Sequence, residues 1–400
     1  MGNRKSNIIY ADHSATTPVH PQVIEEMQRV MTDVWGNASS VHQIGRSAKV
    51  ELEMARERIA GSINAARNET FFTSGGTESD NFALRGFAEA FRSKGKHIIT
   101  SKAEHHAVLH TCEALEKNGY SVTYLEVNEH GMVNPGDVKA AITDETILIS
   151  IMHANNEIGA INPIGEIGAL AHKHDIPFHT DAVQTFGKLS IDVKELNVDA
   201  LSVSGHKIYG PKGIGFLYVN RNLDIIPQLT GGAQERNLRA GTENLPAIMG
   251  LAKAVELSME KRESESERLR NLQHQLEAGL TEQISGTTVH GHPEKRIPGL
   301  THIGFDNVDG ESLVMNLDMR GIAVSSGSAC SSGSVNPSHG LMAMGYEPDR
   351  AKSAIRISLG RSNTEEDIPV LVEAIKEEVA RVRSAGENRN QTKKEKVVHA

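Results

Sequence analysis

The sequence predicts an α/β protein in which a large, doubly wound and mostly parallel sheet domain is joined to a smaller α+β domain. From about residue 70 to residue 220, short β-rich runs alternate with helical patterns, as repeated βα units require. A long amphipathic helix follows, and beyond residue 299 the order of the elements changes. With 400 residues, 38% of them hydrophobic, the chain is long enough to bury two cores.

The first region consists of predicted strands separated by helices or turns. Asn118-Gly119 and Asn134-Pro135-Gly136 interrupt the pattern because these residues favour turns. Helical patterns are found at 78–91, 107–117, 164–174 and 193–196. The predicted strands are 70–73, 97–101, 121–127, 146–152, 176–181, 198–204 and 215–219.

The second region begins with a charged stretch at 255–284, where leucines recur at three- and four-residue steps from Leu269 to Leu280, as one helix face requires. Strands are then predicted at 300–305, 322–325 and 354–359, with helices at 311–320 and from Asn363 onward. We place the large domain at 15–255 and the small domain at 1–14 plus 256–385. Residues 386–400 show no apolar period and are expected to form a disordered tail.

Charge and composition exclude several classes of protein. Lys and Arg total 42 against 51 Asp and Glu, and the net charge of −9 argues against a direct nucleic-acid surface. No run of eighteen apolar residues and no apolar leader is present, so we expect a cytoplasmic protein without a membrane partner. Cys112 and Cys330 are expected to be free thiols in such a compartment. Nineteen histidines invite a metal hypothesis, but no CxxC or HExxH motif occurs, and no resident metal is predicted.

A glycine turn after the first predicted strand is a candidate phosphate site. Residues 74–77 read Ser-Gly-Gly-Thr and precede a helix, so backbone N–H groups, the helix dipole and the Thr77 hydroxyl converge on one anion. The alternative is an ordinary βα turn with a threonine cap. Residues 205–210 have the glycine spacing of a P-loop, but Pro211 stands where the phosphate-binding lysine would follow. We therefore predict no nucleotide site there.

Two further strand ends carry polar residues that suit a cofactor site. One buried strand ends at Asp181, with Gln184 three residues on, and another ends at 204–207 with Lys207. Ligands bind at the carboxyl ends of parallel strands, so these side chains and the glycine turn are expected to share one crevice. A lysine, a carboxylate and an anion site are what pyridoxal 5'-phosphate needs. A buried Asp–Lys ion pair is the alternative.

Several motifs in one order then resemble a known family. They lie at 10–17, 73–81, 103–108, 155–159, 179–184, 204–213, 239–242 and 325–334. Together they are similar to those of cysteine desulfurases of the NifS/IscS type, within the class V aminotransferase superfamily, from Tyr10 to about Arg383. The resemblance implies the fold type I of pyridoxal-phosphate-dependent transferases, and conversion of L-cysteine to L-alanine.

The resemblance also implies a role for each matching residue. Lys207 matches the Schiff-base lysine, and Asp181 matches the partner of the pyridinium nitrogen. His105 matches a catalytic imidazole stacked on the cofactor ring, with Gln184 and Asn156 beside the phenolic oxygen and the substrate. The remaining matches are the phosphate ligands Gly76, Thr77, Ser204 and His206, a phosphate ligand from the neighbouring subunit at Thr242, and the arginine for the substrate carboxylate at Arg356.

Cys330 is the predicted sulfur-accepting thiol. The surrounding segment 325–334 has almost no apolar side chain to bury, so the thiol is expected to be exposed, whereas Cys112 lies on a helix as a buried small residue. The segment matches the family motif Ser-Ser-Gly-Ser-Ala-Cys, which implies a persulfide on Cys330. A cluster held transiently by this thiol is also compatible with the motif.

The implied partners are a second copy of the chain and a sulfur acceptor, such as an iron–sulfur scaffold or a protein of tRNA thiolation. The polar tail after Gly386 differs from the family's scaffold-docking end, so the acceptor is left open. Ala38 replaces a common proline, which should alter a turn only. Alternative functions are an aminotransferase or selenocysteine lyase of the same fold, and a non-catalytic sulfur-carrier module.

Overall fold

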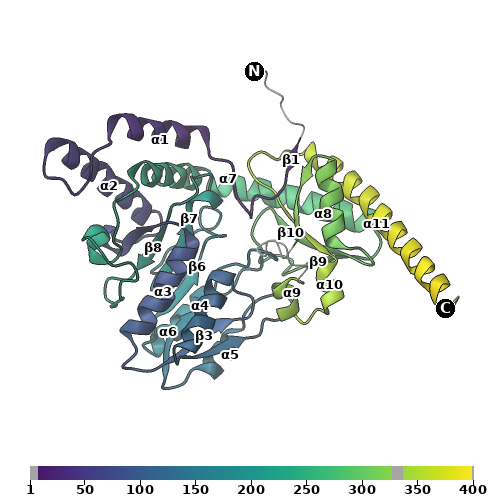
Figure 1. Ribbon diagram of the computed structural model, residues 1–400, viewed down its shortest axis with the longest axis horizontal. Coiled ribbons are helices and arrows are strands. Elements are labelled where there is room, and N and C mark those ends of the chain that lie inside the picture. The colour runs from purple at the N-terminus through teal and green to yellow at the C-terminus, as the bar shows by residue number, and fades with distance from the viewer. Residues whose placement is uncertain (1–7, 327–336, 399–400) are drawn as a thin grey trace.

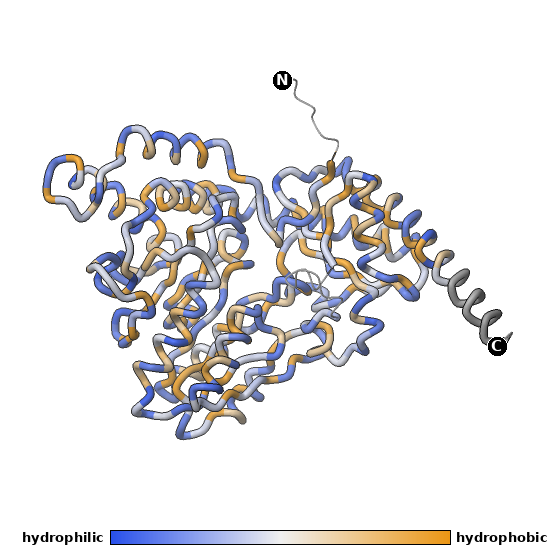
Figure 2. Tube along the Cα trace, in the orientation of Figure 1, coloured by the Kyte–Doolittle hydropathy of each residue, from blue (hydrophilic) through white to orange (hydrophobic). Residues whose placement is uncertain are grey.

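The computed structural model describes residues 8–326 and 337–398 of the chain (Figure 1). Two main sheets lie beside each other, and the long helix α7 (Leu245–Gln283) runs from the first to the second. Apolar residues gather along the strands and alternate with hydrophilic residues along the surrounding helices (Figure 2). Among the described residues, no helix is both long and apolar enough to cross a membrane.

The large sheet is built from the strands that the sequence predicts between residues 70 and 219. They are β2 (Thr70–Thr73), β3 (His97–Ser101), β4 (Ser121–Leu125), β5 (Thr146–Ser150), β6 (Phe178–Asp181), β7 (Ala200–Ser204) and β8 (Gly215–Val219). Their order across the sheet is β2-β8-β7-β6-β5-β3-β4. β8 is antiparallel to β2 and β7, and the pairs from β7 to β4 are parallel. The predicted mostly parallel sheet is confirmed, with β8 as its antiparallel member.

Helices cover both faces of this sheet. They are α1 (Pro21–Asp33), α2 (Gln43–Gly61), α3 (Gly76–Ala90), α4 (His106–Lys117), α5 (Pro135–Ala141) and α6 (Ile164–Lys173). Phe71 and Ile98 pack on the face covered by α3 and α4, whereas Phe72 and Ile99 pack on the face covered by α1, α2, α6 and α7. Successive strand residues point to opposite faces. Both faces are therefore buried, which is why the strands read as continuous apolar runs.

The second sheet has the order β12-β13-β10-β9 and is antiparallel. Leu272, Leu276 and Leu280 of α7 share its core with Ile355 and Ile357, so the leucine stripe seen in the sequence is buried. α7 crosses position 255 without a break, and the domain boundaries stay a prediction. The elements of this region are β1 (Ile9–Tyr10), which pairs with β11 (Ile322–Ala323), β9 (Thr287–His290), β10 (Leu300–Phe305), β12 (Ser325–Ser326), β13 (Ala354–Ser358), α8 (Gly310–Met319), α9 (His339–Ala343), α10 (Pro348–Lys352) and α11 (Asp367–Val398).

The structure differs locally from expectation. Residues 193–196 form turns and not a helix, since Asp192 caps this segment through its carboxylate and Asn197 reverses the backbone at φ 53°. α11 continues to Val398 through the range expected to be disordered. An apolar period is needed for a helix to bury one face, but not for a helix to form. Glu, Gln, Lys and Arg extend a helix that has already nucleated at little cost in free energy. The described residues also form the short 3₁₀ helices η1 (Arg67–Glu69), η2 (Gly205–Lys207) and η3 (Gln234–Asn237).

Candidate active site

A cavity of about 510 Å³ lies where β6 and β7 end. The first turn of α3, the start of α4 and Arg356 of β13 also border it, so both sheets contribute to its wall. A parallel sheet binds ligands at this edge because its strands all present their carboxyl ends there. The residues singled out from the sequence that line the cavity are Gly76, Thr77, His105, Asn156, Asp181, Gln184, Ser204, His206, Lys207 and Arg356.

The glycine turn places the first turn of α3 against the cavity. Gly75 is the N-cap and provides no side-chain cap, so the first N–H groups of the helix are left for a ligand. Its φ of 147° is one that glycine adopts without strain. A Cβ at Gly76 would lie 2.7 Å from Val183 Cγ2, and one at Gly75 would lie 3.5 Å from Ser204 Oγ. The paired glycines therefore allow the close approach that makes an anion site beside Ser204.

Lys207 lies in η2, directly after β7. Its Nζ donates to the carbonyl oxygens of Ser14 at 2.5 Å and Ala15 at 2.8 Å. Gln184 Nε2 donates to the same Ser14 oxygen at 2.9 Å. The N-terminal segment thus forms a wall of the cavity and orients the lysine. Next to Lys207 in the chain, His206 has its Nδ1 3.1 Å from Thr16 Oγ1, and burial lowers the pKa of His206 to about 4.

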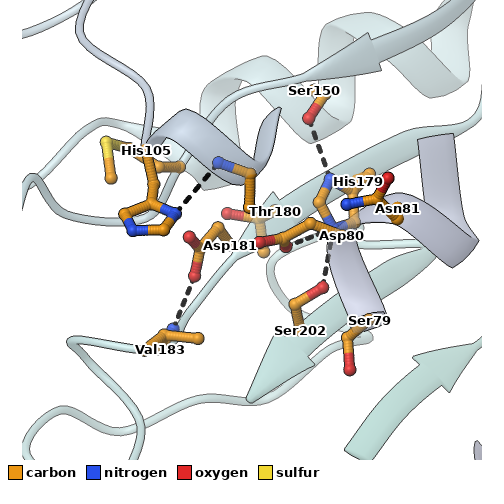
Figure 3. A network of polar contacts seen from close by, with 12 residues as sticks. Ser79, Asp80, Asn81, His105, Ser150, His179, Thr180, Asp181, Val183 and Ser202 are labelled. Atoms are coloured by element: carbon orange, nitrogen blue, oxygen red, sulfur yellow. Dashed lines mark hydrogen bonds and ion pairs between the residues drawn. The ribbon is translucent and has the colours of Figure 1, made fainter. Parts of the chain in front are cut away.

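Asp181 ends β6 and faces Lys207 across the cavity. Its Oδ1 accepts the Val183 N–H at 2.8 Å (Figure 3). Burial raises the pKa of Asp181 to about 6, while the Val183 hydrogen bond and the charge of Lys207 act in the opposite direction. Asp80, His105 and Asp181 bring their ligand atoms within 4.8 Å of one another. Since this group borders the cavity that suits an organic cofactor, we assign no metal to it.

His105 is the N-cap of α4. Its Nδ1 accepts the Ala107 N–H at 3.1 Å, so the ring proton of the neutral imidazole lies on Nε2 (Figure 3). Burial, and then the charge of Lys207, lower the pKa of His105 to about 4. The side chain is therefore neutral near pH 7 and presents one N–H donor to a ligand.

Arg356 reaches the cavity from the second sheet. It is 3% exposed, and its Nη1 donates to the Asn156 carbonyl at 2.9 Å. Its Nη2 forms an ion pair with Asp12 Oδ1 at 2.8 Å, and its buried Nε has no partner within residues 8–326 and 337–398. Each terminal nitrogen carries two N–H groups, so the guanidinium keeps donors for a carboxylate.

The cavity fits the cofactor that the sequence resemblance implies. Buried oxygens of Asn156 (Oδ1) and Gln184 (Oε1) border it without a partner among the residues that the structure describes, which is costly unless a polar ligand supplies one. Its volume lies within the usual range for small-molecule sites. The α3 turn suits a phosphate, Asp181 suits a ring nitrogen and Lys207 suits an aldehyde.

Some predicted residues lie elsewhere. Thr242 is exposed and does not line the cavity of its own protomer, although the bidentate Arg239–Glu78 ion pair holds the neighbouring segment at the cavity rim. Cys330 lies outside the described residues. Cys112 is fully buried, and burial raises the pKa of its thiol to about 12, so it is not a nucleophile.

Sequence reasoning missed several residues at the site. Asp12, Ser14 and Ala15 hold Arg356 and Lys207, although the motif at 10–17 had been noted without roles. Asp80 lies in the motif at 73–81 and received no role either. Glu104 is fully buried, and burial raises its pKa to about 8. Only their surroundings in the fold distinguish these residues from surface polar groups.

Comparisons with known proteins agree with this geometry. Residues 9–371 match the model of the aminotransferase class-V family. The chain is 50% identical to the cysteine desulfurase IscS of Methanosarcina thermophila, over 95% of this chain and 94% of that protein. It is 48% identical to the putative cysteine desulfurase IscS 1 of Bacillus subtilis, over 94% and 99% of the two chains. Among solved structures, a NifS-like protein matches with a TM-score of 0.88 at 36% identity, over 93% of this chain and 99% of that one. SspA in complex with cysteine matches with a TM-score of 0.79 at 40% identity, over 88% and 98%.

Proposed function

This chain belongs to the class-V aminotransferase family and is a cysteine desulfurase that uses pyridoxal 5'-phosphate, and on that premise we propose how its residues move sulfur from L-cysteine. The observation that carries the proposal is the meeting of Lys207, Asp181 and the first turn of α3 in one cavity. An amine, a carboxylate and an anion site are the features that this cofactor requires.

Each part of the cavity holds a different part of the cofactor. When bound, pyridoxal phosphate supplies an aldehyde that bonds to amines and a cationic ring that withdraws electrons. The N–H groups of the α3 turn, with Thr77, Ser204 and His206, hold the phosphate. The Asp181 carboxylate holds the proton on the ring nitrogen, and Lys207 provides the amine.

Substrate binding and proton movement follow from the neighbouring groups. Arg356 binds the carboxylate of L-cysteine through the N–H groups left after its bonds to Asn156 and Asp12. Lys207, the amine that would hold the cofactor aldehyde, would also move the proton at the substrate α-carbon through its Nζ. His105, neutral and with its N–H on Nε2, would donate a hydrogen bond to a group bound in the cavity.

Sulfur transfer requires a nucleophile, and we assign this role to Cys330. Its thiolate bonds to the substrate sulfur, the carbon–sulfur bond breaks, and the electron pair stays on carbon. A proton replaces sulfur on that carbon, giving L-alanine, and Cys330 carries a persulfide. One thiol loses sulfur and another gains it, so no oxidant is needed.

The described residues on both sides of Cys330 support its access to the cavity. Before the segment, Ser325 of β12 pairs directly with Arg356. After it, the Ser338 hydroxyl donates to Glu157, which follows Asn156 in the chain. His339 Nε2 lies 2.8 Å from the carbonyl of Glu104, which precedes His105. The described residues before and after the segment therefore contact residues that line the cavity or that are next to a lining residue in the chain.

We also propose a homodimer in which Thr242 reaches the phosphate of the partner's site. Exposed large apolar residues are concentrated on α1, α2 and the link between them: Ile24, Met31, Trp35, Val41, Ile44, Val50 and Met54. Such a concentration marks an interaction surface.

The acceptor of the persulfide stays open between an iron–sulfur scaffold and a protein of tRNA thiolation. The cytoplasm stays the predicted compartment.

A single-turnover experiment tests the role of Cys330. Cys330→Ser and the control Cys112→Ala are loaded with pyridoxal phosphate and mixed with one equivalent of L-cysteine. Mass spectrometry should find one added sulfur on Cys330 in the wild type and in Cys112→Ala. Cys330→Ser should still bind L-cysteine and change the cofactor absorbance, but form almost no alanine. Wild-type alanine yield from Cys330→Ser, or sulfur on Cys112, would overturn the assignment.

A further inference from the structure

Asp80 is a buried carboxyl group that no step above uses. It lies on α3, is 1% exposed, and borders the cavity next to Asp181 and His105. Its Oδ1 accepts no hydrogen bond from the described part of the chain. The ion pair found for Asp80 among the described residues is to His179 Nε2, at 3.6 Å. A carboxylate buried in this way, with one oxygen that accepts no hydrogen bond, is poorly stabilised in its charged form.

The titratable groups that face Asp80 are two carboxyls and two imidazoles. Asp181 of β6 and Glu104, just before α4, both act on it, and His105 and His179 face it as neutral rings. Burial, and then the charge of Asp181, raise the pKa of Asp80 well above its usual value, opposed by a hydrogen bond from Ser202. Asp181 alone gains the Val183 N–H and the attraction of Lys207. When two carboxyl groups lie this close, the one with stabilising partners ionises, and here that is Asp181.

A chain of side chains leads from Asp80 into the sheet. His179 is fully buried, with Nε2 3.0 Å from Ser202 Oγ and Nδ1 2.8 Å from Ser150 Oγ (Figure 3). Burial lowers the pKa of His179 to about 3, so the ring is neutral and has one donor and one acceptor. The members come from α3, β7, β6 and β5 in turn. The direction of every hydrogen bond in this series of side chains therefore depends on which end of the series, Asp80 or Ser150, supplies a proton.

We propose that Asp80 is held as the neutral acid and donates a hydrogen bond to Ser202, so that Asp181 alone carries the negative charge of the pair at the place where the cofactor's ring nitrogen would be held. Ser202 then donates to His179 Nε2, and His179 donates from Nδ1 to Ser150. An ionised Asp80 would reverse each bond and move the ring proton to Nε2. The effect on the ring rests on the proposed role of Asp181. Asp80 is accordingly a positioning residue, which keeps the second acid of the pair uncharged.

Matched amide substitutions test this in the holoenzyme. Asp80→Asn mimics the neutral acid, and the pH dependence of the cofactor's visible absorbance should move by less than about 0.5 unit. Asp181→Asn should move it by more than about one unit or release the cofactor. Asp80→Ala removes the donor and should weaken pyridoxal phosphate binding relative to Asp80→Asn. A shift above about one unit in Asp80→Asn would overturn the proposal, since it would mean that a charge had been removed.

Two spectroscopic readouts do not depend on activity. The infrared difference between wild type and Asp80→Asn at pH 7 should show loss of a protonated carboxyl, and loss of a carboxylate would refute the proposal. In wild-type protein with ¹⁵N-labelled histidine, His179 should be protonated on Nδ1, with His179→Gln identifying its signal. Protonation on Nε2 would refute it even if Asp80→Asn does not fold. If Asp181→Asn is as mild as Asp80→Asn, the role of Asp181 fails, while these readouts still decide the state of Asp80.

Discussion

Arg356→Lys should weaken L-cysteine binding while leaving the chemical step nearly intact. Lysine keeps the positive charge but has a single ammonium group with three donors. The carbonyl of Asn156 and the carboxylate of Asp12, at 2.9 and 2.8 Å from Arg356, would engage two of them. One donor would remain for the substrate carboxylate in place of a planar pair.

The magnitude follows from losing one charge-assisted hydrogen bond, about 1.5–3 kcal/mol. This corresponds to a fall of roughly 10- to 150-fold in kcat/KM. The carboxylate contact is the same before and during the reaction, so the loss should appear mainly in KM. Alanine formation measured against L-cysteine concentration at fixed reductant gives both parameters.

Arg296→Lys is the matched control. Arg296 is 7% exposed and donates two hydrogen bonds to Glu277, both 2.8 Å, away from the cavity lining. Arg296→Lys should lower the stability of the protein without raising KM for L-cysteine. An unchanged KM in Arg356→Lys, or a fall in kcat alone, would refute the role assigned to Arg356. An equal rise in KM for both variants would point to a general packing defect.

Other predictions concern stability and assembly. Without cofactor, the Asp181 carboxyl has a pKa raised from 3.8 to about 6, so it stabilises the fold fully below pH 3.8, and this contribution is lost as pH rises through 6. The free energy of unfolding of apo Asp181→Asn, measured by thermal unfolding, should lack this pH-dependent contribution, which is at most about 3 kcal/mol. If the free energies of wild type and variant changed with pH in parallel, the raised pKa would be contradicted. Gly215→Ala would place a Cβ 2.3 Å from the Val203 carbonyl oxygen. Urea unfolding should show that the free energy of unfolding falls by about 1–3 kcal/mol. An unchanged free energy would mean that β7 and β8 can move apart to make room for the Cβ. Mixed dimers of Lys207→Ala with Thr242→Ala should regain one intact site. Activity no higher than that of either parent would argue against shared sites.

The elements of the large sheet could be predicted from local pattern. Each strand is a short apolar run that ends in turn residues, and this signal depends only on neighbours in the chain. The segments before residue 70 gave no such signal, although α1 and α2 form there. Their N-caps are His20 and His42, whose ring nitrogens accept Gln22 N–H and Gly45 N–H, whereas the usual caps are Ser, Thr, Asp or Asn. The helices are instead held by packing against α7.

The sequence alone determined the α/β class, the glycine turn and the polar strand ends at Asp181 and Lys207, because each depends on residues close together in the chain. The family resemblance then supplied a role for Arg356. Only the tertiary structure decided what surrounds them. The carbonyls that hold Lys207 come from Ser14 and Ala15, more than 190 residues away. Asp80 acquires its proton-holding environment only when α3 packs over Asp181. Burial and like charge act through space, so the protonation of such a group is a property of the fold and not of its local sequence.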